Sequence, residues 1–205
     1  MKMKSLAVTQ RAVTERSHNI RVDTLDQRWP IFIANCGFAV VPVSNVPNNV
    51  ETLMTATQPS GILLTGGGDV ASLGGQDYDR MEVENLLFDW AQKTKTPVLG
   101  VCRGMQFLQE RFKIALQPIS DHVATNHEIE FANSSRKVNS YHAYGSYNTT
   151  KEIEILATSE DGVVEAIRHI TKPIFGIMWH PERTDPFSTS DIELFRQVFG
   201  TKEAS

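Results

Sequence analysis

The sequence predicts an α/β fold in which helices flank a mostly parallel central sheet, with a small antiparallel strand section in the second half. In the first half, short apolar runs alternate with segments of helical periodicity, which is typical of a parallel sheet covered on both faces. The second half contains short strand-like runs joined by turns. The chain has 205 residues and no evident repeat or linker. This length can bury one core, so we expect a single domain over residues 1–205.

The first half contains four strand-like runs and two helical segments. The predicted strands are Leu6–Thr9, Ala39–Pro42, Ile62–Leu64 and Val98–Val101. A helix is expected over Asp26–Asn35. An amphipathic helix is expected between the last two strands, with these apolar residues on its core face: Val83, Leu86, Leu87, Trp90 and Ala91.

The second half contains shorter predicted strands, and one more predicted helix follows them. The predicted strands are Val138–Asn139, Ile153–Ala157, Val163–Ile167 and Ile174–Trp179, with a turn at Asp161-Gly162. A last helix is expected over Asp191–Phe199. Its predicted buried residues are Ile192, Phe195 and Phe199.

The run Gly100-Val101-Cys102-Arg103-Gly104 lies where a predicted strand meets a helix whose apolar residues include Met105 and Leu108. This layout indicates a nucleophile elbow, a sharp turn that presents a reactive side chain above the sheet edge. The helix amino terminus favours the thiolate, which is the attacking form of cysteine. The alternative is a buried core thiol. Cys36 has no such frame, and we interpret it as structural.

A candidate base for this cysteine lies near the end of the chain. The predicted strand Ile174–Trp179 leads into His180-Pro181-Glu182. Side chains two apart on a strand face the same way, so Glu182 could orient His180 if the strand continues through Pro181. A carboxylate that orients an imidazole also stabilises its protonated form. Taken alone, His180 could equally be a histidine that ends a strand.

Consecutive glycines follow another predicted strand, in Gly66-Gly67-Gly68-Asp69. Backbone amides in such a loop can stabilise an oxyanion, and the amide of Arg103, just after Cys102, is the natural second donor. A phosphate-binding loop is the competing interpretation. The run contains neither G-K-[ST] nor G-x-G-x-x-G, which weakens that interpretation.

Four motifs together resemble the class I glutamine amidotransferase family, and within it the γ-glutamyl hydrolases of peptidase family C26. They are Gly66-Gly67-Gly68-Asp69, Cys102-Arg103-Gly104-Met105-Gln106, Val138-Asn139-Ser140-Tyr141-His142 and Trp179-His180-Pro181-Glu182. The stretch from Asp121-His122-Val123 to Asn126-His127-Glu128-Ile129 also resembles an H-x(4)-H stretch of the family. The resemblance spans nearly the whole chain, and it implies a flavodoxin-like three-layer fold.

The resemblance also implies roles for individual residues. Cys102 would attack a γ-glutamyl carbonyl, His180 would act as base and then acid, and Glu182 would orient His180. The amides of Gly67 and Arg103 would bind the oxyanion. The following residues would bind the glutamyl α-amino and α-carboxylate groups: Gln106, Asn139, Ser140, Tyr141 and His142. The resemblance implies no cofactor and assigns no residue as a metal ligand.

The chain departs from the family pattern beside the expected active site. Val70–Gly75 is shorter than the loop of polyamine- and folate-type hydrolases, which suggests a different amine portion of the substrate. One subgroup fits these departures better: Thr9-Gln10-Arg11, His122-Val123 and Val138–His142 resemble the γ-glutamyl-CDP-amidate hydrolases of surface-polysaccharide phosphoramidate synthesis. Four arginines are then candidates for a pyrophosphate contact, although each alone is more often an ordinary paired surface residue: Arg11, Arg21, Arg28 and Arg103.

Composition excludes several function classes. The 20 basic and 24 acidic residues give a net charge of −4, which predicts neither nucleic-acid nor membrane binding. No membrane span or signal peptide is expected, and a working thiol favours a reducing compartment, so we expect a cytoplasmic protein. The expected partner is a small γ-glutamyl substrate, and a homodimer is compatible with the sequence.

Three function classes compete. The preferred one is a cysteine-dependent hydrolase that passes through a γ-glutamyl thioester and releases glutamate. The alternative is a glutaminase subunit that supplies ammonia to a separate synthetase chain. The third is a non-catalytic binding relative, which ranks low because such proteins tend to lose the nucleophile or the histidine.

Overall fold

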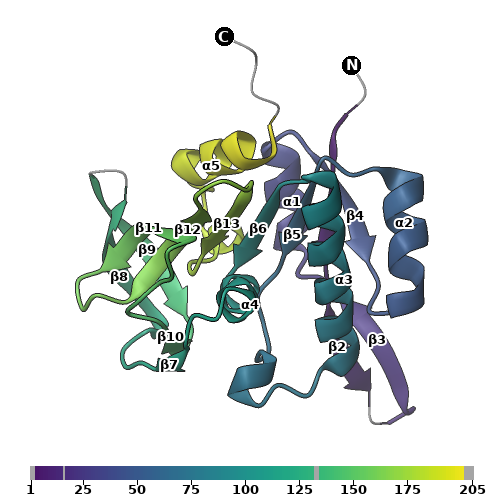
Figure 1. Cartoon of the computed structure of the whole chain (residues 1–205), viewed down its shortest axis with the longest axis horizontal. Helices are drawn as coiled ribbons and strands as arrows, with labels where there is room; N and C mark the ends of the chain where they lie inside the picture. Colours follow the sequence, from purple (N-terminus) through teal and green to yellow (C-terminus); the bar gives the residue numbers. More distant parts are fainter. Residues whose placement is uncertain (1–2, 16, 132–133, 201–205) are drawn as a thin grey trace.

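The computed structural model describes residues 3–15, 17–131 and 134–200, and a nine-stranded sheet runs through its centre (Figure 1). In spatial order its strands are β4 (Ala39–Val43), β1 (Ser5–Thr9), β5 (Gly61–Leu64), β6 (Val98–Val101), β13 (Ile174–Ile177), β12 (Val164–His169), β11 (Ile153–Ser159), β8 (Val123–Phe131) and β9 (Ser134–Tyr141).

The direction of the strands changes at β13. From β4 to β13 neighbouring strands pair in parallel, and from β13 to β9 they pair in antiparallel fashion. The antiparallel strands β8, β9 and β11 lie at the left of Figure 1. The predicted α/β class is confirmed, but the antiparallel section is larger than expected. Mixed polar residues concealed the long β8–β9 hairpin, of which the sequence predicts only Val138–Asn139.

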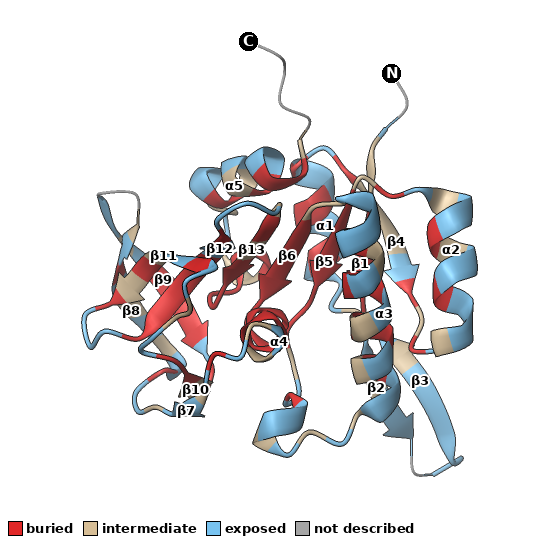
Figure 2. Ribbon diagram, viewed as in Figure 1, coloured by how far each residue is buried: buried red, intermediate tan, exposed pale blue. Residues whose placement is uncertain are grey.

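Helices cover both faces of the sheet. On one face, α1 (Arg28–Asn35) and α5 (Thr189–Phe199) bury Phe32 and Phe195 against Leu63 of the central sheet. On the other face lie α2 (Val50–Thr57), α3 (Tyr78–Thr94) and α4 (Arg103–Arg111), which pack against Ile62 and Leu64. The central strands are therefore buried throughout, as Figure 2 shows. This double covering explains their continuous apolar runs.

Several predicted boundaries and buried positions differ from the structure. The first helix begins at Arg28 because the Asp26 carboxylate accepts a hydrogen bond from the Arg28 amide, 3.0 Å away. In α3, Leu86 is 39% exposed, whereas Glu84 and Phe88 are buried, so the core face is rotated from the predicted one. Ile192 is only half-buried. The periodicity could not show that a charged residue occupies this face of α3.

The remaining elements are short. Beyond the central sheet lie the hairpin β2 (Arg11–Glu15) and β3 (Ile20–Thr24), and the pair β7 (Gln117–Pro118) and β10 (Tyr144–Gly145). Single 3-10 turns are η1 (Pro47–Asn49), η2 (Ala71–Leu73) and η3 (Pro181–Arg183). Among the described helices, none is long and apolar enough to cross a membrane.

Candidate active site

A cleft of about 440 Å³ opens where the carboxyl ends of β5, β6 and β13 meet. The glycine loop after β5 provides Gly67 and Gly68, the turn after β6 provides Cys102, and the segment after β13 provides His180. Three segments far apart in the sequence therefore share one cavity.

Cys102 lies in a strained turn between β6 and α4. Its φ is +52° and its ψ −107°, a conformation that non-glycine residues rarely adopt. The neighbouring glycines permit close packing, because a Cβ on Gly100 would lie 2.4 Å from the Gly104 carbonyl oxygen. A Cβ on Gly104 would lie 2.1 Å from the Leu64 oxygen. This is the local geometry that the nucleophile-elbow interpretation predicts.

His180 and Glu182 form a buried hydrogen bond beside Cys102. His180 Nδ1 lies 2.8 Å from Glu182 Oε1, so this nitrogen donates and Nε2 remains for the sulfur. Burial lowers the pKa of His180, but its hydrogen bonds with Cys102 and Glu182 outweigh burial and raise it to about 9. The predicted strand geometry is wrong here, since β13 ends at Ile177 and the η3 turn brings Glu182 back to the imidazole.

Of the five predicted substrate-binding residues, the structure places Gln106, Tyr141 and His142 on the cleft. Gln106 Nε2 donates to the Tyr144 oxygen at 3.0 Å, and the Tyr141 ring meets the His180 ring edge-on.

Asn139 and Ser140 do not line this cleft. Asn139 Oδ1 accepts from the His180 amide and Asn139 Nδ2 donates to the His180 oxygen, both at 2.8 Å. The Ser140 hydroxyl donates to the His122 oxygen at 2.6 Å. Asn139 thus holds the main chain of His180, and Ser140 holds the adjacent loop. The motif could not reveal this, because the pattern alone does not show which of its polar side chains bond to distant segments of the chain.

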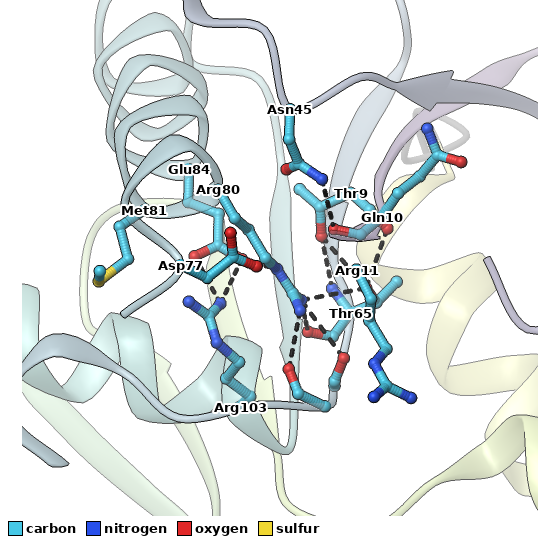
Figure 3. A network of polar contacts seen from close by, with 12 residues as sticks. Thr9, Gln10, Arg11, Asn45, Thr65, Asp77, Arg80, Met81, Glu84 and Arg103 are labelled. Atoms are coloured by element: carbon cyan, nitrogen blue, oxygen red, sulfur yellow. Dashed lines mark hydrogen bonds and ion pairs between the residues drawn. The ribbon is translucent and has the colours of Figure 1, made fainter. Parts of the chain in front are cut away.

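A buried ionic network lies behind the glycine loop (Figure 3). Arg80 donates to the carbonyl oxygens of Thr65 and Gly67 at 2.7 Å, and to that of Gly66 at 3.3 Å. In a trans peptide the next N–H points opposite to the carbonyl, so the Gly67 amide lies on the side away from Arg80. The Arg80 guanidinium therefore orients one of the two predicted oxyanion donors.

Glu84 connects Arg80 to the side chain of Arg103, whose backbone amide is the second predicted oxyanion donor. It accepts from Arg80 Nε at 3.0 Å and from Arg103 Nη1 at 2.6 Å, and all three side chains are buried. Arg103 is the first residue of α4, where backbone amides have no partner inside the helix. Sequence reasoning missed Arg80 and Glu84, although charged residues four apart on an otherwise apolar face were a usable signal.

The four arginines proposed for a pyrophosphate contact differ in their surroundings. Arg103 is buried against Glu84, Arg28 pairs with Asp26, and Arg21 pairs with Asp77 and Asp79. Arg103 is not available for such a contact, since its side chain is 1% exposed and pairs with Glu84.

Arg11 lies against the glycine loop. A Cβ on Gly67 would be 2.8 Å from Arg11 Cδ, and Arg11 lines a smaller cleft with His180 and Glu182. Among the four arginines, Arg11 is therefore the one best placed to meet an anionic group at the active site.

Cys102 is expected to react with iodoacetamide much faster than Cys36 near neutral pH. Burial raises the pKa of Cys36 to about 12, whereas Cys102 lines a cleft at a helix amino terminus beside His180. Peptide mass spectrometry after timed labelling measures both rates in one sample. Equal labelling of the two thiols would contradict an activated Cys102.

Comparison with known proteins shows which families and sequences this chain is similar to. The family model described as Peptidase C26 matches residues 6–182. The chain is 24% identical to a γ-glutamyl-CDP-amidate hydrolase of Campylobacter jejuni, over 95% of this chain and 96% of the relative. It is 30% identical to a glutamine-hydrolysing GMP synthase subunit of Methanococcus vannielii, over 69% of this chain and 75% of the relative.

A solved structure shares the fold. It is described as a GMP synthase subunit from Thermoplasma acidophilum. The TM-score is 0.74 at 18% identity, over 98% of this chain and 94% of the other.

Proposed function

The chain belongs to the peptidase C26 family, and from this premise we propose that it hydrolyses a γ-glutamyl amide or amidate bond through a thioester on Cys102. It is a C–N hydrolase of the glutamine amidotransferase type. The observation that carries the proposal is the meeting of Cys102, the His180–Glu182 pair and the glycine loop at one cleft.

In the proposed reaction, the Cys102 thiolate attacks the γ-carbonyl carbon, and the negative charge moves to the carbonyl oxygen. The amides of Gly67 and Arg103 stabilise this oxyanion. Collapse breaks the C–N bond, His180 protonates the leaving nitrogen, and a γ-glutamyl thioester remains. His180 then takes a proton from water, which attacks the thioester, and glutamate leaves as the thiol re-forms.

We further propose γ-glutamyl-CDP-amidate as the substrate. Support comes from the relative of that activity, which aligns over nearly the whole of both chains, and from Arg11 beside the predicted oxyanion loop. A guanidinium there can bind phosphate oxygens of the leaving group.

Arg11→Ala is expected to raise the KM for a γ-glutamyl phosphoramidate nucleotide by about 10-fold or more, since a hydrogen bond to a charged group contributes about 1.5–3 kcal/mol. The KM for glutamine should stay unchanged. Steady-state release of glutamate measures both. Arg168→Ala is the matched control, because Arg168 is exposed and pairs with Glu154. An equal rise for both substrates would argue against a phosphate contact.

Glu182→Ala is expected to leave a slow residual turnover. The base survives, but its orientation and the stabilisation of its protonated form are lost, which typically costs on the order of 10⁴-fold in kcat. The pKa of His180 should also fall below about 9, because the Glu182 hydrogen bond helps to raise it. NMR titration of the His180 ring measures this shift. An unchanged titration would show that Glu182 does not support the imidazolium.

A glutaminase chain that supplies ammonia to a separate synthetase is the second candidate. The relatives named as glutamine-hydrolysing GMP synthase subunits favour it. The isolated chain should be incubated with glutamine, γ-glutamyl amines, folate polyglutamate and γ-glutamyl phosphoramidate nucleotides, and released glutamate measured. Unassisted turnover of a γ-glutamyl compound supports the hydrolase. If the isolated chain releases no glutamate from any of these compounds, and a synthetase partner restores the release from glutamine, the result supports the ammonia-supplying glutaminase.

A further inference from the structure

Three histidines surround one buried carboxylate beside the active-site cleft. No step of the proposed reaction involves this cluster. His122 precedes β8, His127 lies on β8, His142 follows β9, and Glu165 lies on β12. His122 and His127 form the H-x(4)-H stretch of the sequence. The Glu165 side chain is 0% exposed and that of His142 1%.

The ring nitrogens of the three histidines lie as far from one Glu165 oxygen as two ligand atoms of the same metal ion lie from each other. The distances to Glu165 Oε1 are 3.3 Å from His122 Nδ1, 3.4 Å from His127 Nε2 and 3.3 Å from His142 Nε2. None of these four atoms has a hydrogen-bond partner of acceptable geometry among the described residues. Two ligands of a tetrahedral zinc ion, each about 2.0–2.1 Å from the metal, are themselves about 3.3 Å apart.

Two of the rings lie between two acceptors each. His122 Nε2 is 3.1 Å from Asp161 Oδ2, while its Nδ1 faces Glu165. His142 Nδ1 is 3.2 Å from the Tyr144 oxygen, while its Nε2 faces Glu165. A neutral imidazole has only one N–H, so each ring directs a lone pair at an acceptor unless the ring is protonated or its lone pair binds a cation.

His122 also has the usual surroundings of a metal ligand. Metal-binding histidines commonly donate their second ring N–H to a carboxylate, and His122 Nε2 meets Asp161 in this way. The ligand atoms of His122, His127 and Glu165 all lie within 4.8 Å of one another. A separate cleft of about 410 Å³ is lined by His122, His127 and Asp161, so an ion can enter from solvent.

We propose that His122 Nδ1, His127 Nε2 and Glu165 bind one divalent transition-metal ion, with Zn²⁺ as the probe. Two imidazoles and a carboxylate suit this ion, and three protein ligands leave a position open to the second cleft. No metal ligand is expected from the sequence, so this site departs from that expectation. Because His142 contacts the same carboxylate and lines the active-site cleft, the ion would brace one wall of that cleft.

The test measures zinc binding directly, without an activity assay. Wild-type protein is stripped with a chelator, dialysed and titrated with ZnCl₂ by calorimetry, and the bound metal is counted by mass spectrometry. One Zn²⁺ per chain is expected. In His127→Ala and Glu165→Gln the affinity should fall at least about 100-fold, since losing an outer partner alone costs about 10- to 100-fold.

Two controls locate the bound ion. Cys102→Ser removes the thiol that could bind zinc in the active site, and it should retain the stoichiometry and affinity of the wild type. His18→Ala removes an exposed histidine that lies between β2 and β3 and pairs with Glu15, and it should also bind zinc normally. Loss of binding in Cys102→Ser, absence of binding in the wild type, or unchanged binding in His127→Ala would each overturn the proposal.

Cobalt provides a readout on the unaltered, folded protein. Co²⁺ added to the stripped wild type should produce the intense visible bands of a low-coordinate site, and Zn²⁺ should displace them. His127 is the preferred position for the variant because its side chain is 16% exposed, and circular dichroism checks its fold. Only the weak bands of hexahydrated cobalt in the wild type would contradict the site.

Discussion

Replacing Cys102 with alanine is expected to lower kcat on a γ-glutamyl substrate by at least about 10⁴-fold, because the thioester cannot form. The positive φ of Cys102 adds a structural effect, since alanine must also adopt +52° in the tight turn. Released glutamate measures turnover, and intact-mass spectrometry detects the acyl-enzyme. The wild type should gain the mass of one γ-glutamyl group, whereas the variant should gain none.

Cys36→Ala is the matched control for this experiment. Cys36 is a buried residue at the carboxyl end of α1 and lines neither active-site cleft, so its replacement should reduce stability slightly and leave kcat near that of the wild type. Wild-type turnover in Cys102→Ala, with the fold intact by circular dichroism, would end the thioester proposal.

Replacing His180 with alanine is expected to have an effect of similar size. The variant loses the group that protonates the leaving nitrogen and activates water, and residues acting as one unit each cost about as much as the whole unit. Asn139 holds His180 through main-chain atoms, so the alanine variant keeps both of those hydrogen bonds. The fold of the segment should therefore survive. Retention of more than about a tenth of the turnover would contradict the assigned role.

The same variant gives a prediction for stability against pH. The pKa of His180 is raised from 6.5 to about 9 in the folded protein, so its protonated form stabilises the folded state. This contribution is fully present below pH 6.5 and is lost as pH rises through 9. Urea unfolding across this range should show the wild type losing stability relative to His180→Ala. A constant difference would argue against the raised pKa.

Much of the candidate site could be predicted from the sequence because its residues are held by local chain geometry. The turn at Cys102 needs small neighbours, and Gly100 and Gly104 therefore appear as a recognisable frame. His180 and Glu182 are close in the chain, so their contact depended on one turn. Even there the sequence predicts the pairing on a strand, whereas a 3-10 turn brings the two residues together.

Residues that act through distant segments could not be predicted in the same way. Asn139 meets His180 across 41 positions of the chain, and Glu84 meets Arg103 across 19. Periodicity reports burial on one element and carries no information on which buried polar groups pair between elements. For this reason periodicity predicts Leu86 as buried, whereas Glu84 occupies the core face. The substrate contact expected of Asn139 comes from the family resemblance, which does not reveal its bonds to His180 either.

The clamp that Arg80 forms on three consecutive carbonyls has an evolutionary consequence. Arg80 lies on α3 and donates hydrogen bonds to the backbone carbonyls of the glycine loop. No residue of α3 lines either active-site cleft. No residue of Val70–Gly75 makes these contacts, so the exposed positions Ala71 and Ser72 can change while Arg80 keeps its hold on the three carbonyls. Substrate preference could diversify at this edge in a lineage without dismantling the machinery that breaks the bond.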